Sequence, residues 1–248
     1  MEKEWNIIYE DAELIVTYKP SDLAVQTSKM GQKDLVSMLK NDRVKKKEPP
    51  YVAVINRLDQ PVEGLVLFAK TKEAAADLSR QLQGGQIGKY YRAVVLNQTG
   101  KDLTAGEKGT LTDYLLKDGK TNLSKVVNAD TKGAKKAVLE YEVLTVKENR
   151  ADLFIHLQTG RHHQIRVQMA HAGLPLYGDV KYNTAWRQYV GNGAAGCAAD
   201  KMDVEATGKT EVPDCGEAVN KAERKISGSR SVGRSEKMEP ALCASRLE

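Results

Sequence analysis

Short apolar stretches, each ended by turn residues, recur along most of the chain. Runs of β-branched and aromatic residues, and alternation of apolar with polar residues, predict β-strands. The expected strands lie at residues 13–18, 51–55, 65–70, 89–96, 110–116, 124–128, 136–147 and 152–158. Because most of them follow one another without an intervening helix, the pattern favours an α+β fold over a doubly wound one. We expect a mixed, mostly antiparallel central sheet with flanking helices.

Other stretches carry apolar residues three and four apart, which is the spacing of an amphipathic helix. Helices are expected at residues 33–40, 72–82 and 161–172. Thr71 can cap the second helix, and Gly84 stands where that helix should end. On the third helix, His162, Arg166 and Met169 should share one face.

The character of the sequence changes after Asn183, where Gly, Ala, Ser and charged residues replace the apolar pattern. Such a composition cannot bury enough apolar surface to hold a fixed structure. We therefore expect one main domain over residues 1–183 and a flexible, low-complexity insertion over 184–238. A short alternating pattern at 239–248 predicts a strand that completes part of the main domain.

Composition adds little to this picture. The three cysteines, Cys197, Cys215 and Cys243, are widely spaced, which favours neither a disulfide framework nor a zinc site and suggests a reducing, cytoplasmic setting. The chain has no apolar run of the length that a signal sequence or a membrane span requires. Its net charge of +5 suits a polyanionic partner without requiring one.

Two polar features invite a functional interpretation. Asp59 directly follows the strand expected at 51–55, where a rigid sheet can present a catalytic carboxylate on an accessible loop. From the pattern alone, an aspartate there is more often a turn former. The basic run at 43–47 can meet RNA phosphates, although such runs more often form a solvated face.

Three of the four histidines, His162, His163 and His171, fall within one short segment. Adjacent histidines cannot point the same way from a helix, neither is followed by a histidine four residues later, and no cysteine is near. The pattern therefore does not favour a metal site.

Four motifs, taken together, resemble those of the RluA-type pseudouridine synthases. NRLDQPVEGLVLFAKT resembles the family's HRLDxxTSGLLxxAKT, and TGRHHQIRVQMAHAGLPLYGD resembles TGRTHQIRVHxxxxGxPIxGD. KYYRAVV is similar to KxYxAxV, and IIYEDAELIVTYKPSDLAVQ is similar to IIYEDxxLIVxNKPxGLxVH. The four motifs occur in the family's order between residues 7 and 182.

The resemblance implies the pseudouridine synthase fold, with residues 1–183 as its catalytic domain. It also implies that uridine in structured RNA, ribosomal or transfer RNA, is isomerised to pseudouridine without cofactor or metal, by a protein we expect to be monomeric. Asp59 matches the catalytic aspartate, Arg166 the arginine that pairs with it, and Tyr91 the tyrosine that stacks on the flipped uracil. The implied RNA-binding residues are Arg57, Asn56, Arg161, His163 and Gln164.

The chain departs from the family pattern at several positions. Asn56 stands where the family has His, His162 stands at a Thr, and Val62-Glu63 replaces Thr-Ser. We expect Glu63 to face solvent, because a second carboxylate in the site would repel phosphate. The C-terminal stretch ALCASRLE resembles a family strand, but the hairpin that follows it in the family is expected to be truncated.

Two other functions compete with the implied one. A catalytically weak RNA-binding protein on the same fold would account for the departures, but it has no need of Asp59, Tyr91 and Arg166 together. A metal-dependent hydrolase would use His162, His163 and Asp179, and it predicts bound zinc.

Overall fold

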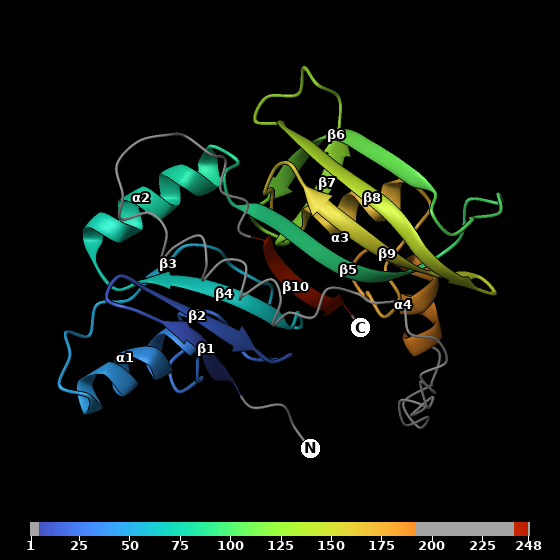
Figure 1. Cartoon of the computed structure of the whole chain (residues 1–248). Coiled ribbons are helices and arrows are strands. Elements are labelled where there is room, and N and C mark those ends of the chain that lie inside the picture. The colour runs from blue at the N-terminus through green and yellow to red at the C-terminus, as the bar shows by residue number, and fades with distance from the viewer. Residues whose placement is uncertain (1–4, 192–240, 248) are drawn as a thin grey trace. The chain divides into compact units, whose positions relative to one another are not determined.

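A computed structural model describes residues 5–191 and 241–247 (Figure 1). The chain divides into two compact units, with the boundary between Arg92 and Ala93 inside one strand, β5 (Gly88–Leu96). The α+β class expected from the sequence is confirmed, and the strands belong to two sheets. Within the described residues, no helix is long and apolar enough to cross a membrane.

The first unit contains a four-stranded antiparallel sheet in the order β1-β2-β4-β3 (blue to cyan in Figure 1). Its strands are β1 (Asn6–Glu10), β2 (Leu14–Lys19), β3 (Ala53–Val54) and β4 (Gly64–Ala69). Every residue of β4 is buried. A strand covered on both faces needs a continuous apolar run, and GLVLFA supplies it.

The two faces of that sheet are covered by helices α1 (Leu35–Lys45) and α2 (Lys72–Gln83). On one face, Val66 and Phe68 join a core cluster with Leu35 of α1. On the other face, Leu65 and Leu67 belong to a cluster that Leu78 and Leu82 of α2 pack against. Alternate residues of β4 therefore serve opposite faces, as the two-residue period of a strand requires.

The second unit is a sheet in the order β5-β9-β8-β6-β7, coloured green to yellow in Figure 1. Its further elements are β6 (Lys108–Asp118), β7 (Leu123–Val127), β8 (Lys135–Lys147), β9 (Arg150–Leu157), α3 (Gln164–His171) and α4 (Thr184–Gly191). The β6–β7, β6–β8 and β8–β9 pairings are all antiparallel. Val167 of α3 packs with Leu115 and Ala137, which places this helix on one face of the sheet.

The structure differs from the sequence-based expectation at several element boundaries. Strand β1 was not expected, and only Ala53 and Val54 of the stretch 51–55 pair as a strand. Helix α1 continues to Lys45, beyond the expected end at residue 40. These are differences of local pairing and length, which periodicity alone determines poorly.

The start of α3 is a more consequential difference. The helix expected from residue 161 begins at Gln164, because His163 takes a left-handed conformation with φ of 52°. The prediction that His162 shares a helical face with Arg166 is therefore wrong, since His162 precedes the helix.

The C-terminal region is only partly described. Helix α4 lies at the start of the stretch 184–238 that we expect to be a flexible insertion, and residues 192–240 lie outside the described residues. A strand, β10 (Ala241–Leu247), lies where residues 239–248 are expected to form one. The expected domain boundaries stay a prediction.

Candidate active site

The loop between β3 and β4 holds Asp59 by means of its neighbours. Leu58 and Val62 are buried, at 7% and 5% exposure, in the core cluster that faces α1. Arg57 and Asp59 are exposed. The two apolar side chains thus anchor the loop to the core and leave the arginine and the carboxylate on the surface.

Lys19, at the end of β2, supports this loop from beneath. Its side chain is fully buried, and the Nζ atom donates hydrogen bonds to the carbonyl oxygens of Pro20 at 2.9 Å, Leu23 at 2.8 Å and Gln60 at 3.0 Å. Gln60 is the residue after Asp59, so the ammonium group holds the backbone directly beside the carboxylate. Sequence reasoning missed Lys19, although its place before Pro20 in a family motif was a usable signal.

The charge environment of Lys19 links it to Asp59. Burial lowers the pKa of Lys19 to about 8, and the negative charges of Asp22, Asp59 and Glu63 oppose that shift. The Asp59 loop therefore lies over a buried lysine whose pKa responds to the charge of Asp59.

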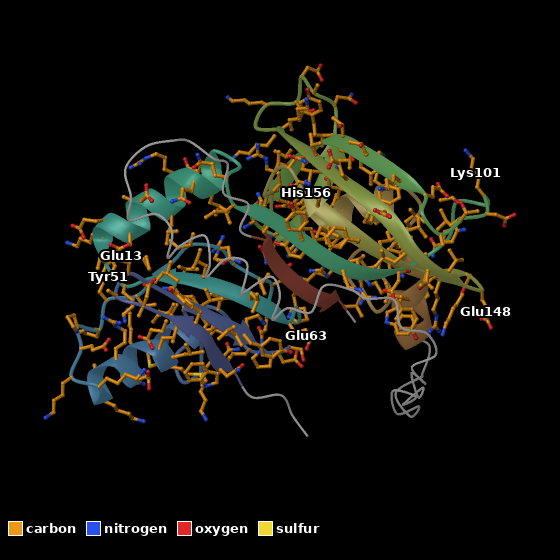
Figure 2. All side chains as sticks on the ribbon, in the orientation of Figure 1. Glu13, Tyr51, Glu63, Lys101, Glu148 and His156 are labelled. Atoms are coloured by element: carbon orange, nitrogen blue, oxygen red, sulfur yellow. The ribbon has the colours of Figure 1, made fainter. Side chains whose placement is uncertain are left out.

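Two positions that depart from the family pattern have structural partners. The Asn56 side chain donates to Leu65 O at 3.2 Å and accepts from Leu67 N at 2.7 Å, so it pairs with the backbone of β4. Glu63, labelled in Figure 2, directly precedes β4, is half-buried and accepts a hydrogen bond from the Tyr18 hydroxyl at 2.6 Å. Glu63 was expected to face solvent, and the structure places it half-buried with Tyr18 as a hydrogen-bond partner of its carboxylate.

Tyr91 on β5 belongs to the same unit as Asp59 and packs against the core cluster that contains Leu58. Burial, helped by the negative charge of Asp59, raises the pKa of the Tyr91 hydroxyl to about 12. The hydroxyl is therefore protonated at neutral pH, and the ring and the carboxylate interact electrostatically.

This shift can be checked by titration. The near-ultraviolet absorbance of wild type and Tyr91→Phe should change in parallel up to about pH 11, because Tyr91 ionises later than an ordinary tyrosine with a pKa near 10. A rise in absorbance near pH 10 that is present in wild type and absent in Tyr91→Phe would show that Tyr91 is accessible to solvent instead.

In the second unit, Arg166 forms a two-point ion pair with Asp179. Its Nε atom donates to Oδ2 and its Nη2 atom to Oδ1, both at 2.7 Å. Asp179 is 8% exposed and also accepts from the backbone N–H groups of Lys181 and Tyr182. Burial raises the pKa of the Asp179 carboxyl, but the hydrogen bonds and charge of Arg166 outweigh it and hold this pKa below its usual range.

This pair changes how Arg166 is understood. The family resemblance pairs Arg166 with Asp59, but these residues lie in different units, and that pairing stays a prediction. Within its own unit Arg166 binds Asp179. Sequence reasoning did not predict that Asp179 fixes the guanidinium of Arg166. The usable signal was the aspartate that closes the second long motif.

Asp179→Asn should lower the free energy of unfolding by about 3 kcal/mol, because removing one partner of a buried ion pair leaves the other uncompensated. Chemical denaturation at neutral pH measures this, and Asp77→Asn, which breaks the exposed pair with Arg80, should change little. Since the Asp179 pKa is lowered by folding, the difference should be complete above about pH 4 and shrink as the pH falls further. Equal stability of the variant and wild type at neutral pH would contradict the assignment.

The other expected RNA-binding residues of this unit have different surroundings. Gln164 is buried and bonds to the Thr159 hydroxyl, Arg161 N and Val138 O, so it fixes the turn before α3. Arg161 is exposed, with its Nε atom donating to Lys136 O at 2.9 Å. Only Arg161 of this pair presents its side chain at the surface.

The histidines are held by hydrogen bonds. His162 Nδ1 lies 2.9 Å from Ser124 Oγ, His163 Nδ1 lies 2.7 Å from the Tyr182 hydroxyl, and the two imidazole rings stack at 3.8 Å. Both oxygens of Asp179 bind Arg166, which counts against the hydrolase alternative. No group of three potential metal ligands occurs among residues 5–191 and 241–247.

Two side chains of the basic run at 43–47, Arg43 and Lys46, bind partners within the first unit. Arg43 is 4% exposed and pairs with Glu48 at 2.8 Å, and Lys46 pairs with Asp42 at 2.8 Å and with Glu10 at 3.2 Å. These side chains tie α1 to its surroundings, so Arg43 in particular does not serve as a phosphate contact.

Comparisons with known proteins give the family of this chain and the class of its fold. A family model described as RNA pseudouridylate synthase matches residues 13–171. The solved structure of human RNA pseudouridylate synthase domain containing 4 superposes with a TM-score of 0.57 at 23% identity, covering 71% of this chain and 68% of that one. Human RNA pseudouridylate synthase domain containing 1 gives 0.57 at 18% identity, with 76% and 74% covered. The chain belongs to the RNA pseudouridylate synthase family.

Three relatives that share one name are similar to this chain. Ribosomal large subunit pseudouridine synthase D of Pseudomonas aeruginosa is 33% identical over 186 residues, which is 74% of this chain and 55% of that protein. The proteins of the same name from Nitrosomonas europaea and Vibrio cholerae are 33% and 34% identical, with 71% of this chain and 49% and 52% of theirs covered. The chain thus spans about half the length of these relatives. The RluA-type resemblance is confirmed.

Proposed function

We propose that this protein converts specific uridines of structured RNA to pseudouridine. The observation that carries the proposal is the Asp59 loop, in which an exposed carboxylate is held by buried neighbours and by Lys19, and interacts with the protonated hydroxyl of Tyr91. Rigid support of an accessible carboxylate is what nucleophilic or general-base catalysis requires. Family membership supports the same reaction.

The reaction is balanced without a co-reactant. The N1–C1′ bond of uridine breaks, the uracil turns, a C5–C1′ bond forms, and the C5 proton is lost while N1 gains one. We assign Asp59 to the nucleophile or base and Tyr91 to stacking on the uracil, with proton transfer at C5 as its second task. Because the reacting atoms are inaccessible within an RNA helix, the target base must be flipped out of the stack. We assign to Arg57, whose side chain is exposed, the task of filling the space that the flipped base leaves.

We assign to Arg166 the role that the family resemblance gives it, that of the arginine that acts with the catalytic aspartate, and to Asp179 the holding of its guanidinium. A guanidinium can bridge two carboxylates because it carries five N–H donors. We infer a ribosomal RNA substrate over transfer RNA, because the relatives described above are named for the large ribosomal subunit. The expected cytoplasmic setting, the absence of a cofactor and the monomeric state stay predictions.

The test uses the purified chain with transcripts of large-subunit ribosomal RNA and of transfer RNAs, labelled with tritium at uridine C5. We expect tritium release from the ribosomal transcript, and mapping of the modified positions should identify discrete uridines. Binding without tritium release would support the alternative, a catalytically weak RNA-binding protein. Comparing pseudouridines in total RNA from cells with and without the gene identifies the natural target.

A further inference from the structure

Tyr182 connects three separate segments of the second unit through its hydroxyl and its backbone. The hydroxyl accepts a hydrogen bond from Ser124 N on β7 at 2.9 Å and lies 2.7 Å from His163 Nδ1 at the start of α3. Its backbone N–H donates to Asp179 Oδ1 at 3.2 Å. A single residue therefore links the edge strand, the helix start and the segment that carries Asp179.

The same tyrosine contacts Arg166. The guanidinium carbon of Arg166 lies 5.1 Å from the centre of the Tyr182 ring, within the range of a cation–π interaction. The Asp179 carboxylate binds the guanidinium by two hydrogen bonds. The ring and the carboxylate together restrict the position of a side chain that would otherwise have several rotatable bonds.

The start of α3 needs support of this kind. His163 precedes the helix with φ of 52°, a left-handed conformation that is unfavourable for a non-glycine residue, and its side chain does not cap the helix. The His163 ring is hydrogen-bonded to the Tyr182 hydroxyl and stacks on the ring of His162. The His162 ring is in turn hydrogen-bonded to Ser124 Oγ. Because Arg166 follows His163 by three residues, the geometry of this turn sets the direction of the arginine.

We propose that Tyr182 is a positioning residue for Arg166. The Ser124 N–H can only donate, so the Tyr182 hydroxyl accepts there, and a second hydrogen bond joins the same hydroxyl to His163 Nδ1. Tyr182 acts on catalysis through the orientation of Arg166 and not through contact with RNA. The inference rests on the proposed function for the role of Arg166, and on the geometry above for the role of Tyr182.

The direct test is Tyr182→Phe in the full chain, which keeps the ring and removes only the hydroxyl. On the ribosomal RNA transcript we expect kcat to fall about tenfold with KM unchanged, which is the fold-change for losing a hydrogen-bond network of about 1.4 kcal/mol in the transition state. The matched control is Tyr177→Phe, because Tyr177 lies in the same segment and packs by its ring against Trp186 and Arg150. This control should retain wild-type kcat.

A double-mutant cycle separates positioning from general stability. In an Arg166→Lys background, which keeps the charge but loses the two-point fork, adding Tyr182→Phe should change kcat by less than twofold. A further tenfold loss in that background would overturn the proposal, as would a rise of KM at constant kcat. A lowered Tm with wild-type kcat per folded molecule would also overturn it.

A readout that does not require activity keeps this inference separate from the proposed function. The Nε–H signal of Arg166 in nitrogen NMR should be protected from exchange in wild type and in Tyr177→Phe, and lose protection in Tyr182→Phe. If wild type released no tritium, the proposed function would fail while this comparison still decided whether Tyr182 holds Arg166. Unchanged protection in Tyr182→Phe overturns the inference.

Discussion

Asp59→Asn should abolish pseudouridine formation while RNA affinity stays within about twofold of wild type. The amide has nearly the same shape as the carboxylate, so the loop held by Leu58, Val62 and Lys19 should keep its conformation. An amide can neither attack carbon nor remove a proton, so the rate should fall by roughly 10³-fold or more. Tritium release measures the rate, and filter binding of the ribosomal transcript measures the affinity.

A matched control for this prediction is Asp22→Asn. Asp22 also lies near the charge of Lys19, and it is exposed in a left-handed conformation that asparagine tolerates. This variant should remain active, which separates loss of the catalytic carboxylate from loss of one negative charge. If the Asp59→Asn variant had wild-type activity, the proposed mechanism would be contradicted.

The second large effect is expected at Lys19→Met. Methionine has a similar length but no donor, so the carbonyl oxygens of Pro20, Leu23 and Gln60 would lose their hydrogen bonds to the lysine. A hydrogen bond to a charged group contributes roughly 1.5–3 kcal/mol, and we expect the free energy of unfolding to fall by about 3 kcal/mol. Because Gln60 adjoins Asp59, kcat should also fall in the molecules that remain folded.

Urea unfolding and kcat below the unfolding transition measure these two effects separately. Lys40→Met, at an exposed position on α1, is the control and should leave both unchanged. If the Lys19→Met protein unfolded at the wild-type urea midpoint, Lys19 would not be what stabilises the Asp59 loop.

Sequence periodicity was sufficient for much of the first unit. The run in β4 and the apolar stripe of α2 are local patterns, and both elements lie where these patterns place them. The ordered motifs identified the family and singled out Asp59, Tyr91 and Arg166, because the residue types and spacings that chemistry requires are written directly in the chain.

The partners of polar side chains could not be derived in this way. Asn56 bonds to β4 and Glu63 to Tyr18, although the sequence suggested RNA contact for one and solvent for the other. Hydrogen-bond partners are decided by which segments meet in space. Residues 18 and 63 are distant along the chain, and only strand pairing brings them together.

The sequence by itself determined the fold class, the family and the loop that carries the carboxylate. Only the tertiary structure decided that Lys19 is buried beneath this loop, that Asp179 binds Arg166 and that α3 begins after a left-handed His163. The physical reason is that periodicity and motif spacing are local properties. Burial of a charge and satisfaction of its hydrogen bonds depend on segments that meet only in the folded protein.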